Sequence, residues 1–416
     1  MPAAVRPNPN TLHIWTVSGE EIVTSADFAG DVRSLKQQLH KRFNISRFRQ
    51  RLVHKGRSLD DDSCARELPT DLQLVFLPYA SVSEEQEEEL ILAASVGHVA
   101  SVEEILMRPQ DPNRRGVFRP MLGDPGNNTA LGKASDRGHT EVVRILLEAR
   151  ADKDGHALGG GYQGPALVLA AARGHVEIVR LLLEAGASKE AIGYFYGSEV
   201  TPLLATIDGH EQIARPESAQ GPREKNTEVA RLLLEARADP NSHRPESVLC
   251  LGHDARPLVA ACQGGHLKAV RLLLFGSVDD EKTPDRKITA SADMHISPAL
   301  VAAASNGHLE VARMLEETVP HSLPGYRHTM PKDTMRLHVL TPLLLASMWG
   351  HVGIAGLLLG ARADADKICG PDDAKALSVA AGEGHEEIVR LLLEAGRHPT
   401  FTFDLCCKCS RSNQDA

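Results

Sequence analysis

The sequence predicts an α+β protein, in which a small head with a mixed sheet wrapped on one helix precedes an all-α solenoid of about eight units. Two observations carry this prediction. Between residues 97 and 385, eight of the Gly-His pairs recur at intervals of 34 to 56 residues, whereas residues 11–80 follow a different hydrophobic rhythm. Aromatic residues make up only 4% of the 416 residues, which suits a core built from many small layers of Leu, Ala and Val.

The Gly-His pairs mark the units of the solenoid. They begin at Gly97, Gly138, Gly174, Gly209, Gly265, Gly307, Gly350 and Gly384. A short Ala-rich segment precedes most pairs and opens with Thr-Pro, Ser-Pro or Pro, as at Thr201-Pro202 and Ser297-Pro298. These residues predict a helix start, because Pro at the first helical position has no N–H to leave unsatisfied. The glycine is expected to end this helix in the left-handed conformation.

A second helix is predicted after each pair. In the segment Glu177–Gly186, Ile178 and Leu182 recur at the spacing of one helix face. Neither helix of a unit can bury its apolar stripe alone, so neighbouring units must stack. Three arginines stand where Gly186 closes its helix, and a left-handed conformation there would cost about 1 kcal/mol each. They are Arg150, Arg237 and Arg362.

These units resemble the ankyrin repeat. The resemblance is carried by Thr201-Pro202-Leu203 through Gly209-His210 and by Gly174-His175 through Gly186-Ala187, and it extends from about residue 84 to residue 397. It implies a non-catalytic array that binds other proteins through its concave face and its long loops. The sequence departs from the family where Leu or Val replaces the usual His of the first helix, at Leu204, Val259 and Leu344.

Long loops lengthen several units beyond about 33 residues. Residues 212–227 form an insertion in the fourth unit, which is expected to be an exposed, mobile excursion. Exposed, bulky loop residues are the predicted protein-binding residues of the array, because aromatic side chains and Arg are common in binding hot spots. They are Phe118, Arg119, Tyr194, Phe195, Tyr196, Tyr326, Arg327 and His328. The alternative is that these side chains pack against neighbouring loops.

The head is predicted from short alternating segments. Leu12 and Ile14 alternate as in a strand, Ser18 to Glu20 read as a turn, and residues 22–24 return as the second strand of a hairpin. A helix of about three turns is expected from Val32 to Phe43. Residues 51–54 and 72–77 are two further apolar runs, each predicted to be a strand.

This order of elements is similar to that of the ubiquitin family, and the segment Gln50–Gly56 followed by Leu59-Asp60-Asp61 is the most specific part of the match. The resemblance places the family's apolar partner-binding patch on Val17, Val53 and Val75. The chain continues past residue 79 without a terminal Gly-Gly, which implies a built-in domain and not a conjugated modifier. The head would then link a client of the array to ubiquitin-dependent turnover, as the alternative to a general interaction module.

Predicted boundaries follow from these patterns. Residues 1–10 are expected to be a flexible N-terminus, 11–80 the ubiquitin-like domain, 81–397 the ankyrin repeat domain and 398–416 a disordered tail that contains cysteines. The acidic run after Ser83 is interpreted as the capped start of the first repeat helix, with an acidic binding tail as the alternative.

Composition and motifs argue against several other classes. The net charge of -9 gives no basic footprint for nucleic acid, and no apolar run reaches the roughly 18 residues of a membrane span. The N-terminal residues contain no secretory signal, and seven unpatterned cysteines favour a reducing compartment. We therefore expect a cytoplasmic or nuclear protein, monomeric, whose partners are other proteins and include ubiquitin-system components.

No catalytic, cofactor or metal site is predicted. Gly159, Gly161 and Gly164 match the spacing of a dinucleotide fingerprint, but no strand precedes them and no βαβ return follows. A single Cys-x-x-Cys in the tail supplies too few ligands for zinc. The Gly-His histidines stand one per layer and are interpreted as structural. The sequence therefore predicts that the chain is not an enzyme.

Overall fold

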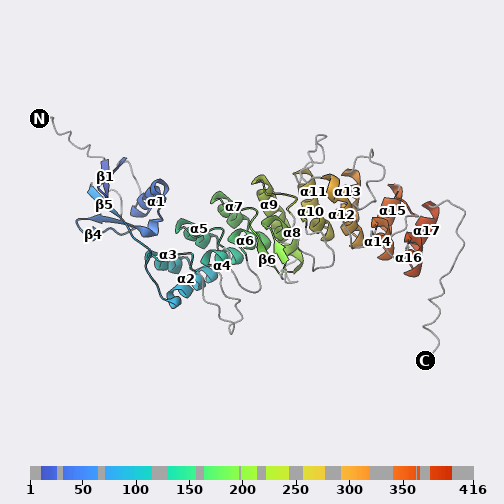
Figure 1. The fold of residues 1–416 in the computed structure, drawn as a ribbon, viewed down its shortest axis with the longest axis horizontal. Coiled ribbons are helices and arrows are strands. Elements are labelled where there is room, and N and C mark those ends of the chain that lie inside the picture. Colours follow the sequence, from blue (N-terminus) through green and yellow to red (C-terminus); the bar gives the residue numbers. More distant parts are fainter. Residues whose placement is uncertain are drawn as a thin grey trace, which may run out of the picture. The chain divides into compact units, whose positions relative to one another are not determined.

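A computed structural model describes most of the chain (Figure 1). The described residues are 11–25, 31–63, 71–114, 129–155, 164–195, 198–212, 222–242, 256–276, 292–318, 341–361, 363–365 and 375–395. The predictions made for residues 1–10 and 398–416 lie outside them. The chain divides into two units, Met1–Ser247 and Val248–Ala416, each of which is described by itself.

The head, in the first unit, is a five-stranded mixed sheet of order β2-β1-β5-β3-β4 with one long helix. Strand β1 pairs antiparallel with β2 and parallel with β5, and β5 pairs antiparallel with β3. The elements are β1 (Thr11–Thr16), β2 (Glu21–Ser25), α1 (Val32–Phe43), η1 (Arg47–Arg49), β3 (Gln50–His54), β4 (Arg57–Ser58) and β5 (Asp71–Phe76). The predicted hairpin, helix and two further strands are confirmed, and the short η1 and β4 were not predicted.

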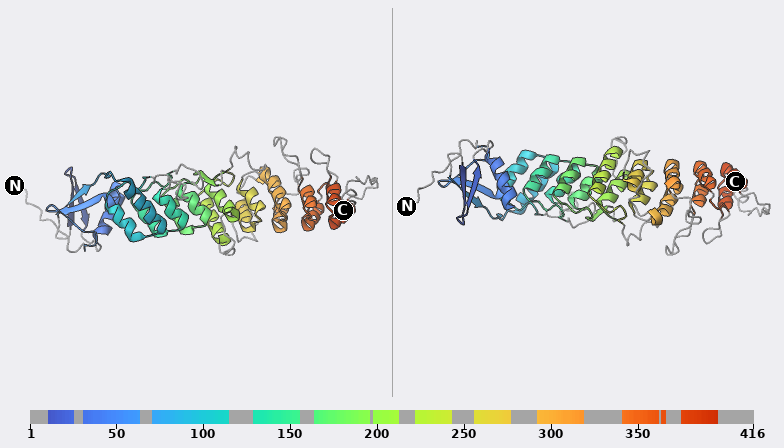
Figure 2. Two further views of the ribbon diagram at one scale, coloured as in Figure 1. Left: turned by 90° about the horizontal axis from the view of Figure 1, so that it is seen from below. Right: turned by 90° about the horizontal axis from the view of Figure 1, so that it is seen from above.

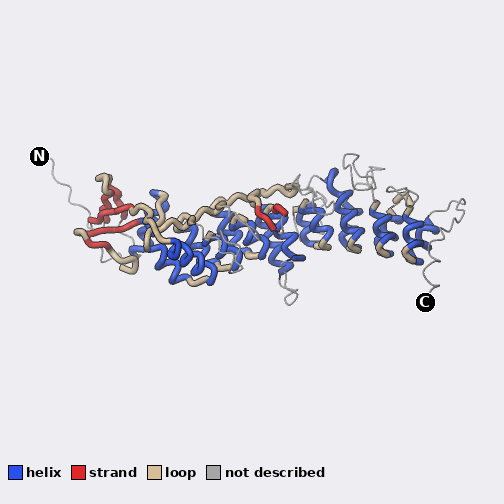
Figure 3. The backbone as a smooth tube through the Cα atoms, turned by 60° about the horizontal axis from the view of Figure 1, so that its bottom comes forward, coloured by secondary structure: helices blue, strands red, loops and turns tan. Residues whose placement is uncertain are grey.

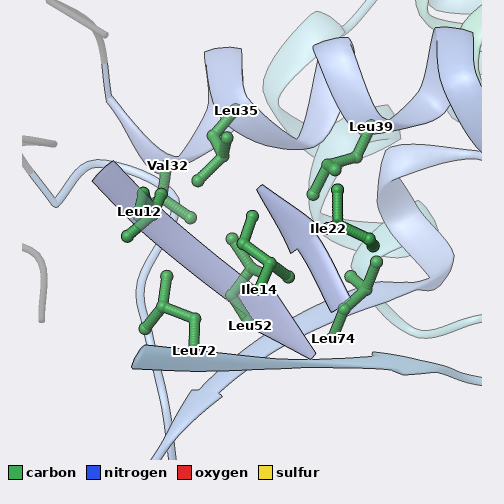
Figure 4. Close-up of a cluster of buried hydrophobic side chains, with 9 residues drawn as sticks. All are labelled: Leu12, Ile14, Ile22, Val32, Leu35, Leu39, Leu52, Leu72 and Leu74. Carbon is green, nitrogen blue, oxygen red and sulfur yellow. The ribbon is translucent and has the colours of Figure 1, made fainter. Parts of the chain in front are cut away.

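The core of the head lies between α1 and the sheet. Figure 4 shows Leu35 and Leu39 reaching from α1 toward the inward-facing side chains of the strands, among them Ile14 and Leu52. Helix α1 begins where Asp31 accepts a hydrogen bond from the backbone N–H of Ser34 at 2.8 Å. Because strand side chains alternate between faces, burying every second residue leaves the others on the outer face of the sheet.

Helix pairs follow the head in the first unit. First helices pack on first helices and second helices on second helices, as the views of Figure 2 show for neighbouring pairs. The pairs are α2 (Glu84–Val96) with α3 (Val99–Met107), α4 (Ala130–Arg137) with α5 (Thr140–Glu148), α6 (Ala166–Arg173) with α7 (Val176–Glu184), and α8 (Pro202–Gln212) with α9 (Pro222–Glu235).

The second unit repeats this pattern with four more pairs. They are α10 (Pro257–Gln263) with α11 (Leu267–Phe275), α12 (Ala292–Ser305) with α13 (Leu309–Thr318), α14 (Pro342–Met348) with α15 (Val352–Gly360), and α16 (Ala376–Gly382) with α17 (Glu386–Ala395). Within the described residues, strands occur in the head and in one hairpin of β6 (Gly193–Phe195) and β7 (Ser198–Val200), drawn red in Figure 3.

The Gly-His pairs join neighbouring repeats. Gly138 ends α4 with φ of +82°, as predicted, and the imidazole of His175 in the next repeat lies against it. The Nε2 atom of His175 donates to the carbonyl oxygen of Asp136 at 3.2 Å. The histidines at 139, 308, 351 and 385 make the same bond to the preceding repeat. Each imidazole therefore has a structural role.

Of the other residues predicted to begin or end a helix, some are confirmed and one is wrong. Thr341 caps α14 by accepting from the N–H of Leu344 at 3.2 Å, and the helix begins at Pro342 as predicted. Arg150 and Arg237 adopt left-handed conformations, with φ of +70° and +64°. Pro298 was predicted to open its helix, which is wrong: α12 begins at Ala292, and Pro298 lies inside it as a residue without an N–H.

The insertion predicted at residues 212–227 in the fourth unit is described only at its two ends. Residues 213–221 lie outside the described residues, but α8 continues through Gly209 to Gln212 and α9 already begins at Pro222. Asn226 is buried, and its Nδ2 donates to the carbonyl oxygen of Thr206 at 3.1 Å. This bond joins α9 to the middle of α8.

Candidate protein-binding surfaces

The outer face of the head's sheet carries the predicted apolar patch. Trp15, Gln73 and Val53 form one row across β1, β5 and β3. Val75 lies in the next row, paired with Arg51. Inward-facing neighbours of these residues are buried in the core, so alternation turns this set outward.

Exposure differs along this face. Val17, which directly follows β1, is 67% exposed, and Trp15 is 42% exposed. Val53 and Val75 are half-buried. The structure therefore places the three predicted valines on the outer side of the sheet or at its edge. Trp15 was not among the predicted residues, although its alternation with Leu12 and Ile14 along the strand predicts a side chain on the outer face of the sheet.

Part of this face meets the first repeat. The Nη2 atom of Arg51 donates to the carbonyl oxygen of Met107, at the end of α3, at 2.8 Å. A cation at the C-terminal end of a helix interacts favourably with its unpaired carbonyl groups. At the opposite edge of the sheet, His13 of β1 pairs with Glu21 of β2. The apolar residues of the face are thus bordered by charged side chains.

A buried charged cluster lies where the head meets the array. This Arg47 cluster consists of Lys36, Arg47, Asp61, Glu103 and Glu148. The side chain of Arg47 is 1% exposed, with Nη2 2.6 Å from Glu103 and Nε 2.8 Å from Glu148. Its Nη1 lies 3.7 Å from Asp61, which also pairs with Lys36.

Burial and pairing shift the pKa values in this cluster. Burial lowers the pKa of Lys36 below its ordinary value, and the hydrogen bond and charge of Asp61 oppose the shift. Burial also acts to lower the pKa of Arg47, but hydrogen bonds and charges of Glu148 and Glu103 outweigh it, so the pKa is raised. Arg47 is therefore held as a charged group by the surrounding carboxylates, with Nη2 hydrogen-bonded to Glu103 and Nε and Nη1 within ion-pair distance only. No local sequence pattern marked it as buried.

Of the predicted loop residues, the structure describes the Tyr194 side chain. It is 45% exposed on β6, next to Ile192, which is 41% exposed. Phe195 ends β6 and pairs with Ser198 through the backbone. The hairpin packs closely on the preceding repeat, since a Cβ atom on Gly164 would lie 3.1 Å from the Cα of Gly193. Gly164 itself is buried.

The other predicted loop residues cannot be placed. Phe118, Arg119, Tyr196, Tyr326, Arg327 and His328 lie outside the described residues. The array does expose large apolar side chains on its helices, which the sequence analysis did not single out. Trp349 is 60% exposed just before Gly350-His351, and Leu92 and Val96 of α2 are each 65% exposed. The sequence analysis predicted contact residues of the array only in its loops, so Trp349, Leu92 and Val96 were not among them.

The described residues offer no arrangement for a metal ion. Among them, no three His, Cys, Asp or Glu side chains come together as ligands would. Cys262 is fully buried, and burial raises the pKa of its thiol far above the ordinary value, which suppresses the reactive thiolate. No helix in the part of the chain that the structure describes has the length and apolar character to span a bilayer.

Comparison with known families agrees with the observed architecture. The family model described as "Ankyrin repeats (3 copies)" matches residues 90–193 and 219–322, together half of the chain, and "Ankyrin repeat" matches residues 340–369. The "Ubiquitin family" model matches residues 12–74. No curated protein matches the chain.

The helix pairs and these matches define a repeat protein of the class that binds other proteins. The chain belongs to the ankyrin repeat family and carries an N-terminal domain of the ubiquitin family.

Proposed function

We propose that the chain is a non-catalytic adaptor that holds one partner protein on its array and another on its head. One observation carries the proposal. The sequence contains two Trp residues, and both are on the surface, Trp15 at 42% and Trp349 at 60% exposure. Trp is enriched in binding hot spots, and burying one in an interface removes a large apolar area from water. One Trp lies on the head and one on the array, which supports two binding surfaces.

The partner of the head is proposed to be a component of the ubiquitin system. Val17, Val53 and Val75 stand where the ubiquitin family has its apolar patch, and they lie on or beside the outer face of the sheet. Three valines bury less area than larger aliphatic side chains, so Trp15 is expected to supply much of the contact. The adaptor would then bring a client of the array to ubiquitin-dependent turnover or signalling.

The array is proposed to bind its client through exposed side chains on helices and loops. Tyr194 and Trp349 are the described candidates. The loop residues 118, 119, 195, 196 and 326–328 remain predictions. Because repeat solenoids vary their exposed residues without disturbing the stacked core, substitutions there should change binding and not folding.

Trp fluorescence can test the head by itself in the full chain. Trp349→Phe leaves Trp15 as the sole Trp, so its emission reports on the sheet face. We expect a saturable blue shift when a recombinant ubiquitin-associated domain is added. Val17→Lys in the same background should weaken binding at least about tenfold, since it places a charge in an apolar contact. Glu20→Lys, in the same turn, is the matched control.

Two outcomes separate the parts of this proposal. Unchanged Trp15 emission at millimolar ubiquitin-associated domain would refute the ubiquitin-system partner. The general adaptor would be refuted separately, if proximity labelling returned the same neighbours for the wild-type chain, Trp15→Ala and Trp349→Ala.

A further inference from the structure

The head contacts α3 from the middle of the helix to the residues just after its end. Glu103, in the middle of this helix, receives Arg47 at 2.6 Å and the Nη1 atom of Arg33 at 3.3 Å. Met107, at its end, receives Arg51 at 2.8 Å. Beyond the helix, the backbone N–H of Ala80 donates to the carbonyl oxygen of Pro109 at 2.7 Å. The contact is therefore extended and involves both side chains and backbone.

Helix α3 is the second helix of the first repeat and occupies an end position. The second helix α5 packs between α3 and α7, whereas α3 has α5 as its one neighbour of this kind among the described helices. Terminal repeats of a solenoid need a polar outer face or a cap, because the neighbour that would cover them is missing. The head contacts α3, the helix that lacks this neighbour.

Arg47 ties this contact to the second repeat as well. Its guanidinium reaches Glu103 on α3 and Glu148 on α5, so one side chain of the head bridges two consecutive repeats. A buried ion pair contributes little net stability, because desolvation offsets the attraction, but breaking one by removing a partner is strongly destabilising. Loss of Arg47 is therefore expected to weaken the contact of the head with both helices.

We propose that the head has a second function: it is the N-terminal cap of the repeat array, held by Arg47 against α3 and α5. This function does not depend on the head binding another protein. It has a consequence for the head's outer face, because a docked head presents Trp15 and Val17 in a constant orientation relative to the first repeats.

Hydrogen exchange of the full chain, read by mass spectrometry, tests the cap. Arg47→Met removes the charge, so Glu148 loses its pair with Arg47 and Glu103 keeps only its pair with Arg33. We expect amide exchange in α2 and α3 to rise at least about tenfold, while β1 and β5 of the head stay protected. Arg144→Met is the control, because Arg144 is 58% exposed and pairs with the equally exposed Glu141 on α5. It should leave exchange unchanged.

A second variant approaches the same contact from the array and leaves the head untouched. Glu103→Leu with Glu148→Leu should also raise exchange in α2 and α3. Its matched control is Glu104→Leu with Glu141→Leu, two exposed residues on the same two helices, at 78% and 58%. If Arg47→Met unfolds the head, the array-side variant still tests the cap, because it leaves the sequence of the head unchanged. The proposal would be overturned if the array-side variant showed the same amide exchange in α2 and α3 as its matched control.

Discussion

The Gly-His contact between repeats gives a prediction with an internal control. Gly138→Ala adds a Cβ atom to a residue at φ +82°, and that atom would lie 2.6 Å from Cε1 and 3.0 Å from Nδ1 of His175. The imidazole must move, although its Nε2 is bonded to the carbonyl oxygen of Asp136 at 3.2 Å. The substitution therefore combines backbone strain with the loss of an inter-repeat hydrogen bond.

The magnitude follows from these two parts. A left-handed residue with a Cβ costs about 1–2 kcal/mol. Losing a part-buried hydrogen bond and displacing a packed ring adds about 1–2 kcal/mol. Gly186→Ala is the matched control, because Gly186 has φ +77° but its Cβ would meet nothing closer than Lys153 at 3.8 Å. We expect a total of about 2–4 kcal/mol for Gly138→Ala and about 1–2 kcal/mol for Gly186→Ala.

Urea unfolding followed by circular dichroism measures both losses. A double-mutant cycle with His175→Ala isolates the contact, since Gly138→Ala should cost only its backbone strain once the imidazole is gone. Equal losses for Gly138→Ala and Gly186→Ala, or no coupling between positions 138 and 175, would refute the reasoning that the histidines join neighbouring repeats.

Two further predictions concern caps. Hydrogen bonds from the side chain and then the backbone of Ser34 hold the pKa of Asp31 below its usual value of 3.8. The folded state therefore binds this proton less tightly than the unfolded state, so the stabilisation is present above pH 3.8 and is lost as the pH falls through the lowered pKa. Asp31→Asn keeps an oxygen that can accept the cap hydrogen bond but removes the titrating carboxyl group. The urea midpoint should therefore fall less steeply at acid pH in this variant than in the wild-type chain. An unchanged pH dependence of the midpoint would contradict this prediction. Arg150→Gly, at φ +70°, should stabilise the chain by about 1 kcal/mol. Arg144→Gly, inside α5, should instead destabilise the chain by a similar amount. If both variants lost stability, the left-handed conformation of Arg150 would not be a source of strain.

The sequence predicted those elements whose signal is local and long enough to show a period. Helix α1 and strand β5 have several apolar residues at the expected spacing, and both were found. By contrast, η1 and β4 have three and two residues, too few for any periodicity. The start of α12 was misplaced because Pro is common at the first helical turn but is not confined to it.

The residues of the candidate surfaces also differ in whether a local sequence pattern could predict them. The resemblance to the ubiquitin family picked out Val53 and Val75, whereas strand alternation, which would have turned Trp15 outward, was not applied to it. The burial of Arg47 was beyond local reasoning, since Glu103 is 56 residues further along the chain and contacts it only in the folded state. An arginine among polar neighbours normally predicts a solvated surface, and it is the carboxylates brought by α3 and α5 that make burial tolerable.

Arg51 connects the head's two proposed functions. It stands beside Val75 in the sheet, yet its guanidinium is bonded to the end of α3. A protein that covers the half-buried Val75 must therefore come close to the C-terminal end of α3 as well. If the head is a cap, its partner meets a composite surface of sheet and first repeat, and releasing the head from α3 would change that surface. Arg47→Met should then weaken binding at Trp15, a coupling that an independent head would not show.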